Sequence, residues 1–284
     1  MLSAALVLAS ADTGDGPGTV TGAGASSGQP KLSAGLERQR WGSRASIPSA
    51  AAVRGAWSYA RHRGGAVSFA VVDTAGRLRA RRGNRRFVSA SVVKAMLLAA
   101  ELGRLERNGL ALDPATEGLL GAMIRFSDND AADSIYLRVG DAGLIEVARL
   151  AGMRRFAVSG YWANAQVTAA DMARCFSRLS RLLAGPHRDW ALALLGSVVK
   201  DQRWGVPRAA GKDWRVFFKG GWRATERGQL VHQVALLRTG DRQLVIAVLT
   251  DGQPSRLYGI HTVRGVADRL LAPVAAGQTV FPPR

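Results

Sequence analysis

The pattern of apolar and polar positions predicts strands near both ends of this chain and helices between them. After a helix predicted over residues 48–62, the segment AVSFAVVDTAGRLRARR has two β-rich runs separated by the turn from Asp73 to Gly76, which predicts a hairpin. The last third returns to β-rich runs and ends in a helix predicted over residues 258–271. Its three predicted strands are WRVFFKGGW, QLVHQVALLRTG and RQLVIAVLTDG.

The middle of the chain has apolar residues at helical spacing. Asp113 suits the N-cap of a helix that begins with Pro114, and Gly109 suits the C-terminal cap of the preceding helix. Helices are predicted over residues 91–108, from residue 114, over 130–137, 143–150 and 168–183, and over 187–199. This order predicts an α+β fold: an antiparallel sheet formed from both chain ends, with flanking helices and an all-helical insertion at about residues 87–212.

The first 30 residues differ in composition from the rest. The apolar run MLSAALVLASA resembles the hydrophobic region and cleavage site of a secretory signal, although no positive residue precedes it; the alternative is an N-terminus without targeting meaning. Residues 12–30 contain six glycines and no lysine or arginine, which is typical of a flexible linker. We therefore expect a truncated signal peptide at residues 1–11, a linker at 12–30, a folded domain at 31–284, and a secreted or extracytoplasmic protein. No apolar segment is long enough to predict a transmembrane helix.

The net charge and the arginine-rich stretch limit the choice of partners. The formal net charge of +18 favours anionic partners or surfaces, such as an anionic cell envelope. Six arginines lie within the ten residues RLRARRGNRR, a density that also occurs in nucleic-acid-binding proteins. This run has strand and turn character, however, with no interleaved aromatic residue and no recognised nucleic-acid-binding motif. We expect a solvated arginine-rich surface and no nucleic acid as partner.

Few side chains are available to bind a metal. The single cysteine, Cys175, excludes an intramolecular disulfide and a cysteine-ligated zinc site. The four histidines show no HExxH spacing. We expect no metal and no cofactor.

The stretch FVSASVVKAMLLAAEL contains one lysine, Lys94, within a run from Phe87 to Ala100 that is otherwise uncharged. A buried ammonium costs several kcal/mol unless it is paired or its pKa shifts. Ser91 lies three residues before Lys94, so their side chains share one helix face. A partly desolvated lysine has a lowered pKa and can take the proton of a serine hydroxyl, which makes the serine a nucleophile.

Two further motifs follow in the chain. FSDNDAA places Ser127, Asp128 and Asn129 at a break between predicted helices, and FFKGGW places Lys219 and two glycines in a predicted strand. The order S-x-x-K, S-D-N, K-x-G is the motif set of class A β-lactamases and penicillin-binding proteins. The chain resembles this family over roughly residues 48–272, also in VTAADMARCFSRLSRLL and ERGQLVHQVALL.

The resemblance implies a role for each matching residue. Ser91 is the nucleophile that becomes acylated, Lys94 is its base or part of the proton relay, and Ser127 passes a proton to the leaving nitrogen. Asn129 and Lys219 bind the substrate, Asn129 also contacting Lys94. The implied oxyanion hole consists of the backbone N–H groups of Ser91 and Trp222, the latter placed on the strand edge by Gly220 and Gly221. Asp128 is expected to be structural.

The chain also departs from the family pattern. The family carries a glutamate in a loop after the S-D-N motif, where it positions the water that removes the acyl group. Here the only glutamate of the interval, Glu146, falls in a predicted helix, and the loop itself is short. Gly220 replaces the usual threonine or serine of the K-x-G motif, and the carboxylate-binding arginine has no clear match, with Arg223 as a candidate.

These features predict a monomeric serine hydrolase that forms an acyl-enzyme on Ser91 with an amide or ester substrate, either a β-lactam or a peptidoglycan-like peptide. Without the loop glutamate, deacylation is expected to be slow. Three alternatives stay open: efficient β-lactam hydrolysis, a D-Ala-D-Ala peptidase, and a catalytically degenerate protein that binds a cell-wall ligand.

Overall fold

A computed structural model of the protein describes residues 48–183 and 185–272. The signal peptide and linker expected at residues 1–11 and 12–30 lie outside this part of the chain. The strands are β1 (Ala66–Val72), β2 (Leu78–Arg81), β3 (Arg86–Val88), β4 (Gln166–Thr168), β5 (Arg215–Thr225), β6 (Gly228–Thr239) and β7 (Arg242–Gln253). The α-helices are α2 (Ala50–Ala60), α3 (Lys94–Arg107), α4 (Pro114–Arg125), α5 (Asn129–Leu150), α6 (Ala169–Ser177), α7 (Leu179–Leu182), α8 (Arg188–Gly196), α9 (Val206–Ala210) and α10 (Arg256–Leu271).

Strands from both ends of the described chain form one antiparallel sheet in the order β2-β1-β7-β6-β5. The register pairs Phe69 of β1 with Val248 of β7, and Lys219 of β5 with Val234 of β6. The predicted hairpin and the three predicted C-terminal strands are therefore confirmed, and so is the α+β fold. β5 is an edge strand, and it contacts the segment that carries Ser91.

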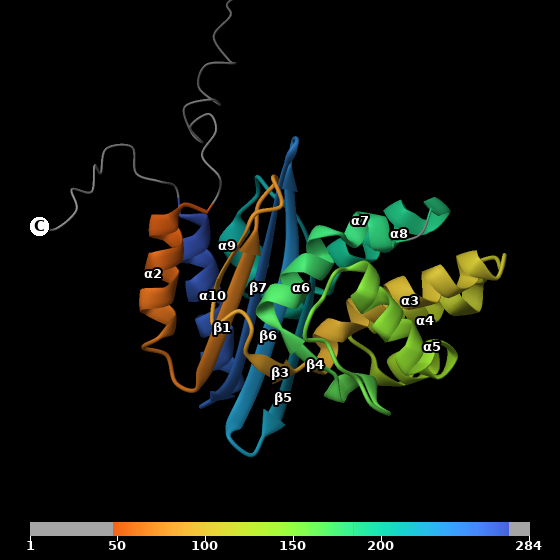
Figure 1. Ribbon diagram of the computed structural model, residues 1–284, viewed down its shortest axis with the longest axis horizontal. Coiled ribbons are helices and arrows are strands. Elements are labelled where there is room, and N and C mark those ends of the chain that lie inside the picture. The colour runs from red at the N-terminus through yellow and green to blue at the C-terminus, as the bar shows by residue number, and fades with distance from the viewer. Residues whose placement is uncertain (1–47, 184, 273–284) are drawn as a thin grey trace, which may run out of the picture. The chain divides into compact units, whose positions relative to one another are not determined.

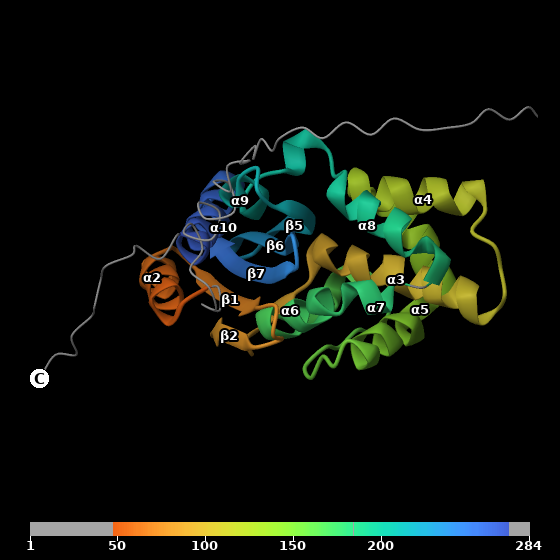
Figure 2. The same cartoon turned by 90° about the horizontal axis from the view of Figure 1, so that it is seen from above.

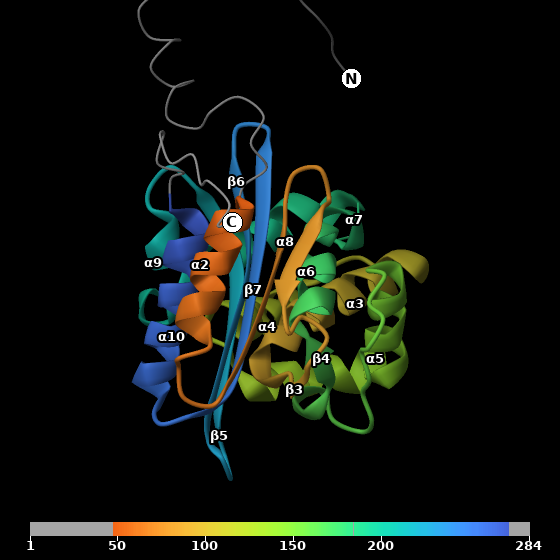
Figure 3. The ribbon, with the colours of Figure 1, turned by 60° about the vertical axis from the view of Figure 1, so that its left-hand side comes forward.

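The sheet lies between two helical layers (Figures 1 and 2). Helices α2 and α10 pack on each other and cover one face, while α6 packs on β1 and β7 from the opposite side. Figure 3 shows the sheet between α2 and α10 on one side and α6 on the other. This double covering explains why all seven residues of β1 are buried and why all of them except Ser68 are apolar.

The predicted helices form, with ends set by the expected caps. The Asp113 side chain accepts a hydrogen bond from the Thr116 N–H at the start of α4, and the Thr168 hydroxyl caps α6 in the same way. The two helices predicted over 130–137 and 143–150 are the two parts of α5, which is interrupted at Gly140 with φ +59°. No helix among the described residues combines the length and apolarity needed to cross a membrane.

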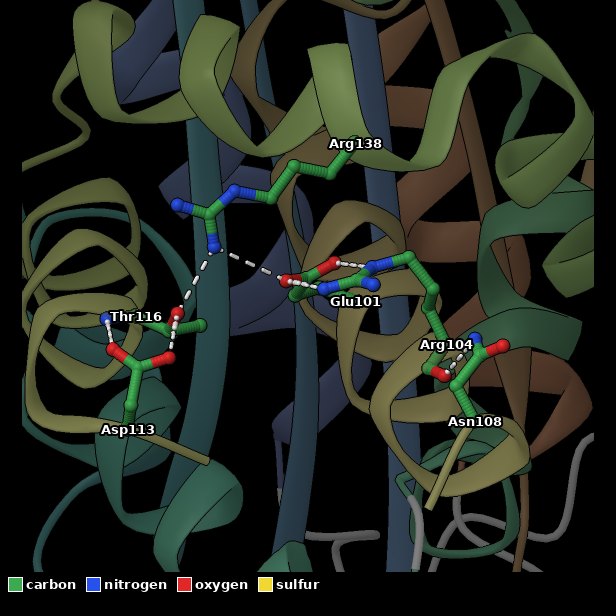
Figure 4. A network of polar contacts seen from close by, with 6 residues as sticks. All are labelled: Glu101, Arg104, Asn108, Asp113, Thr116 and Arg138. Carbon is green, nitrogen blue, oxygen red and sulfur yellow. Dashed lines mark hydrogen bonds and ion pairs between the residues drawn. The ribbon is translucent and has the colours of Figure 1, made fainter. Parts of the chain in front are cut away.

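A buried ion-pair network joins the helices of the insertion (Figure 4). Glu101 of α3 is fully buried and accepts hydrogen bonds from Arg104 at 2.7 and 2.8 Å. Arg138 of α5 reaches both Glu101, at 3.3 Å, and the hydroxyl of Thr116 in α4, at 2.9 Å. The network thereby fixes α4 and α5 against α3, the helix that carries Lys94.

Three elements of the fold, two strands and one helix, were not predicted from the sequence. β3 and β4 form a small separate antiparallel sheet in which Arg86 pairs with Thr168. α9 lies against α10 and is also short. Strands of three residues have too few positions to show alternation, so the sequence pattern does not predict them.

Candidate active site

Ser91 lies on a 3₁₀ turn, η1 (Ala90–Val93), that leads directly into α3. The helix predicted from Ser91 therefore begins as a tighter turn. Ala90 has φ +44°, a left-handed conformation that non-glycine residues rarely adopt. Ser89 holds this turn in place, because its backbone N–H donates to the Ala165 carbonyl at 2.7 Å and its buried hydroxyl donates to the Trp162 carbonyl at 3.2 Å.

Lys94 is fully buried, as its position in an apolar helix predicts. Its ammonium donates to the carbonyl oxygens of Ser127 at 2.6 Å and Asp128 at 2.9 Å, and to Oδ1 of Asn129 at 2.7 Å. These three acceptors match the three protons of the charged form. Burial lowers the pKa of Lys94 to about 8, against the opposing effect of the charges of Asp128 and Asp133. The cluster therefore holds a lysine that can lose its proton near neutral pH.

Ser127 stands between the two lysines of the site. It has φ +62° in the break between α4 and α5, and its hydroxyl accepts a hydrogen bond from Nζ of Lys219 at 2.9 Å. Lys219 is fully buried in β5, and burial together with the nearby positive charge of Lys94 lowers its pKa well below the ordinary value. Asp128 caps α5, because its carboxylate accepts from the Ala131 N–H at 2.8 Å.

Gly221 brings β5 against the turn that carries Ser91. A Cβ at position 221 would lie 2.8 Å from the backbone nitrogen of Ser91 and 3.0 Å from that of Val92, closer than real Cβ contacts. Only glycine fits this approach without displacing backbone. Trp222 follows directly in β5 and is partly buried. The strand edge is therefore next to the Ser91 backbone, where the sequence predicts a pair of N–H donors.

Gly220 also has a structural explanation. A Cβ there would lie 3.2 Å from the indole of Trp204, which packs edge-on against Trp222 with ring centroids 6.1 Å apart. Arg256 lies over the other indole, 4.2 Å from the centroid of the Trp222 ring. The two tryptophans thus occupy the space beside position 220, where a threonine side chain would otherwise stand.

Two residues near Lys94 were missed from the sequence. The ring of Trp162 lies 4.8 Å from Nζ of Lys94, and its indole N–H donates to Asp133 at 2.6 Å. Asp133 follows Asn129 by four residues, one helical turn, and this spacing was an available signal. The position of Trp162 depends on the loop between α5 and β4, and no local pattern indicates it.

The loop between α5 and β4 contains no carboxylate over residues 152–165. Glu146 lies within α5, where it forms two hydrogen bonds of 2.8 Å with Arg149. Arg223, the candidate for carboxylate binding, donates to Oδ1 of Asn164 at 3.0 Å. The described loop therefore supplies no counterpart of the family glutamate.

His232 of β6 connects β3, the strand just before the Ser91 turn, to the main sheet. It is fully buried, one ring nitrogen lies 2.9 Å from the Val88 carbonyl, and the other accepts from the Thr250 N–H at 3.1 Å. Burial lowers its pKa to about 4, so the ring is neutral and ties β3 to the main sheet. Within the described residues no three metal-ligating side chains come together, and the prediction of no metal stays a prediction.

Comparisons with known proteins agree with this arrangement. The model of a family described as the beta-lactamase enzyme family matches residues 115–274, a stretch that begins after Ser91 and Lys94. A comparison with curated protein sequences found no match. Among solved structures, a β-lactamase from Sphaerobacter thermophilus is 23% identical, with a TM-score of 0.68, covering 78% of this chain and 95% of that one.

Two further structures have the same fold. The class A β-lactamase of the last common ancestor of Gram-negative bacteria is 27% identical, with a TM-score of 0.65, covering 78% of this chain and 99% of that one. A β-lactamase from Xanthomonas campestris is 19% identical, with a TM-score of 0.68 and coverages of 78% and 97%. The family match spans more than half of the chain, and the fold agrees with it. This chain therefore belongs to the beta-lactamase enzyme family, as a serine hydrolase of the β-lactamase type.

Proposed function

We propose that this hydrolase acylates Ser91 with an amide or ester substrate, a β-lactam or a peptidoglycan-like peptide, with Lys94 as the base. One observation carries the proposal: two fully buried lysines, Lys94 and Lys219, form one hydrogen-bonded cluster with Ser127 and Asn129, although the four residues come from three separate motifs. Such a cluster of two lysines costs folding free energy, because both charges are desolvated. A catalytic role accounts for that cost.

The proposed first step is attack of the Ser91 hydroxyl oxygen on the substrate carbonyl carbon. With a pKa of about 8, roughly a tenth of Lys94 is neutral at pH 7 and has a lone pair for the serine proton. Lys94 accepts that proton as the Ser91 oxygen–carbon bond forms. The proton then passes through Ser127, whose hydroxyl accepts a hydrogen bond from Lys219. Ser127 delivers it to the departing nitrogen or oxygen as the acyl bond breaks.

The developing oxyanion needs fixed donors. The backbone N–H groups of Ser91 and Trp222 are the proposed pair, supported by the close approach of Gly221 to the Ser91 nitrogen. Asn129 and Lys219 are proposed to bind the substrate amide and carboxylate. A substrate carboxylate beside Lys219 would also favour its charged form.

Water is proposed to remove the acyl group slowly. The loop that carries the family glutamate has no carboxylate over residues 152–165, and Glu146 is bound to Arg149. Asp133 of α5, whose charge acts on Lys94, already accepts the Trp162 N–H. Work on an anionic cell envelope by a secreted monomer fits the net charge of +18 and belongs to the same proposal.

Time-resolved intact-protein mass spectrometry with benzylpenicillin tests this function, with Ser91→Ala beside the wild type. The expected result is an adduct of one penicillin that forms on the wild type, persists for hours and is absent from Ser91→Ala. Rapid release of hydrolysed drug would contradict slow deacylation and identify an efficient β-lactamase. Absence of adduct and of hydrolysis would refute the β-lactam substrate. Ligand binding that is equal in both proteins, without any adduct, would indicate a degenerate binder.

A further inference from the structure

A groove lined by arginines lies beside the candidate active site. It has a volume of about 670 Å³ and lies between the β3–β4 sheet and the end of the β5–β6 hairpin, which meet in the lower part of Figure 1. Arg85 and Arg86 line it from the β3 side, and Arg223 and Arg227 from the hairpin. We call this feature the arginine groove. It brings together two arginines of the RLRARRGNRR stretch with two from more than 130 positions later in the chain.

The positive charge in the arginine groove is only partly compensated. Of the residues lining it, only Glu226 and Asp251 are acidic. Asp251 is engaged, because it pairs with Arg227 and accepts from the Gly252 N–H at 2.9 Å. Four guanidinium groups therefore face two carboxylates. A concave surface with such an excess attracts anions.

Two of the arginines, Arg85 and Arg86, form no side-chain hydrogen bond or ion pair within the described part of the chain, so their donors can serve a ligand. Arg85 lies over the ring of Phe87, 5.6 Å from its centroid, a contact that leaves its N–H groups unused. Arg86 has no charged or hydrogen-bonded side-chain partner within residues 48–183 and 185–272. The floor beneath them is rigid, because Phe87 is buried and packs edge-on against His232. Arginine donors on a fixed frame suit carboxylate or phosphate groups.

Both walls of the arginine groove belong to segments that also carry residues of the candidate active site. Val88, on one wall, precedes Ser91 by three residues in the chain. Arg223, on the other wall, follows Gly221 by two residues, about 7 Å along a strand. In the opposite direction a further hollow of about 310 Å³ continues past Arg85 and Arg227 to Gly65. Because Gly221 lies against the Ser91 turn, a long acyl chain on Ser91 has to span only a few residues to reach the groove.

We infer that the arginine groove is a substrate subsite that binds a second anionic group, a carboxylate carried by an extension of the acyl substrate away from the bond that is cleaved. This inference rests on the proposed acylation of Ser91. It assigns a specificity role to an arginine-rich stretch that lies outside the catalytic motifs. Nucleic acid is disfavoured as the ligand, because the described residues that line the groove include no exposed aromatic side chain for base stacking.

A matched pair of fluorogenic esters tests the subsite. Their acyl chains differ only in a tail of two glutamate or two glutamine residues. We expect the wild type to prefer the glutamate ester in kcat/KM by about tenfold, and the double variant Arg85→Gln/Arg86→Gln to lose that preference. Arg54→Gln/Arg61→Gln is the charge-matched control, because both arginines are exposed on α2 or at its C-cap, outside the groove, and the preference should persist in it. An unchanged preference in the double variant would overturn the inference.

A binding measurement separates this inference from the proposed hydrolase function. Ser91→Ala protein, which cannot be acylated, is titrated with a fluorescein-labelled penta-glutamate peptide. Binding that weakens about tenfold with Arg85→Gln/Arg86→Gln, and not with Arg54→Gln/Arg61→Gln, supports the groove even if neither ester is cleaved. Equal binding of a penta-glutamine peptide would refute it. Tighter arginine-dependent binding of a short DNA duplex, with no difference between the two esters, would refute it in favour of nucleic acid.

Discussion

Lys94 has an acceptor for each of its three protons, and all three acceptors belong to the break before α5. None of these hydrogen bonds goes to Ser91, although the serine lies one turn away. The charged lysine is therefore the resting form, and the neutral form is the one with a free lone pair for Ser91. The free energy that separates the two forms is set by burial, which lowers the pKa of Lys94 to about 8.

The rate of acylation should follow this pKa. We expect kcat/KM for an uncharged ester to rise with pH and level off above about 8, because only neutral Lys94 accepts the Ser91 proton. Lys94→Met should lower the rate about 1000-fold or more. A stopped-flow pH profile measures both. A rate that is constant between about pH 6 and 10 would exclude Lys94 as the base.

The same pKa predicts a change in stability. The unfolded chain keeps the Lys94 proton up to its ordinary pKa of 10.5, whereas the folded protein releases it near 8. Between these values the unfolded state binds more protons, so the free energy of unfolding should rise with pH by up to about 3 kcal/mol. Urea unfolding at several pH values measures the slope. Lys94→Met is the control, and an equal slope in that variant would contradict the assignment.

Gly221 is the second residue on which the site depends, because the backbone of β5 touches the Ser91 turn there. Gly221→Ala should lower kcat/KM about 100-fold, since the added Cβ must move backbone next to the nucleophile. Gly118→Ala is the control, because Gly118 is an exposed position of α4 and nothing lies within 4 Å of its Cβ position. That change should leave the rate unaltered and stabilise the protein by up to about 1 kcal/mol. Normal kinetics in Gly221→Ala would refute the close approach.

Among the elements, α3, α4 and α5 owe their arrangement to Glu101, which is fully buried and bound by two arginines. An uncharged replacement leaves both guanidinium groups without their carboxylate. The exposed pair of Glu146 and Arg149 has the same spacing on a helix but lies in solvent. Burial, and not the ion pair itself, makes the two sites differ.

Glu101→Gln should therefore lower the free energy of unfolding by about 2 kcal/mol, while Glu146→Gln should leave it nearly unchanged. Chemical denaturation of the two variants measures the difference. Because α3 carries Lys94, Glu101→Gln should also slow acylation. Equal stabilities for the two variants would show that the network does not hold the helices.

For the whole molecule, the sheet and the helical insertion share one hydrophobic core. Met123 of α4 and Ile246 of β7 are both fully buried in the same cluster of apolar side chains. Ser91 and Lys219 lie where the two parts meet, so the active site exists only when both are folded. A shared core predicts one cooperative unfolding transition.

Met123→Ala and Ile246→Ala should each lower the free energy of unfolding by about 2 to 5 kcal/mol and leave a single transition. Differential scanning calorimetry, with near- and far-ultraviolet circular dichroism on the same samples, measures it. If one variant shifted only part of the signal, the insertion and the sheet would be separate folding units.

Local sequence patterns determined much of this structure. Turn residues predict the hairpin at Asp73, and N-cap residues predict the helix starts at Asp113 and Thr168. Long runs of mostly apolar residues predict β6 and β7. Such signals act between neighbours in the chain, so they can be read without the fold. The three motifs around Ser91, Ser127 and Lys219 likewise stand in the sequence, and the isolated charge of Lys94 in an apolar helix marks a residue that must be paired or have its pKa shifted on folding.

Only the tertiary structure decided which distant residues meet. Trp162 covers Lys94, Trp204 fills the space beside Gly220, and His232 ties β3 to the sheet, although none of these pairs has a local signature. The arginine groove forms in the same way, from segments joined by strand pairing. The physical reason is that burial, packing and pKa shifts depend on side chains brought together across the chain, whereas periodicity and capping depend on residues a few positions apart.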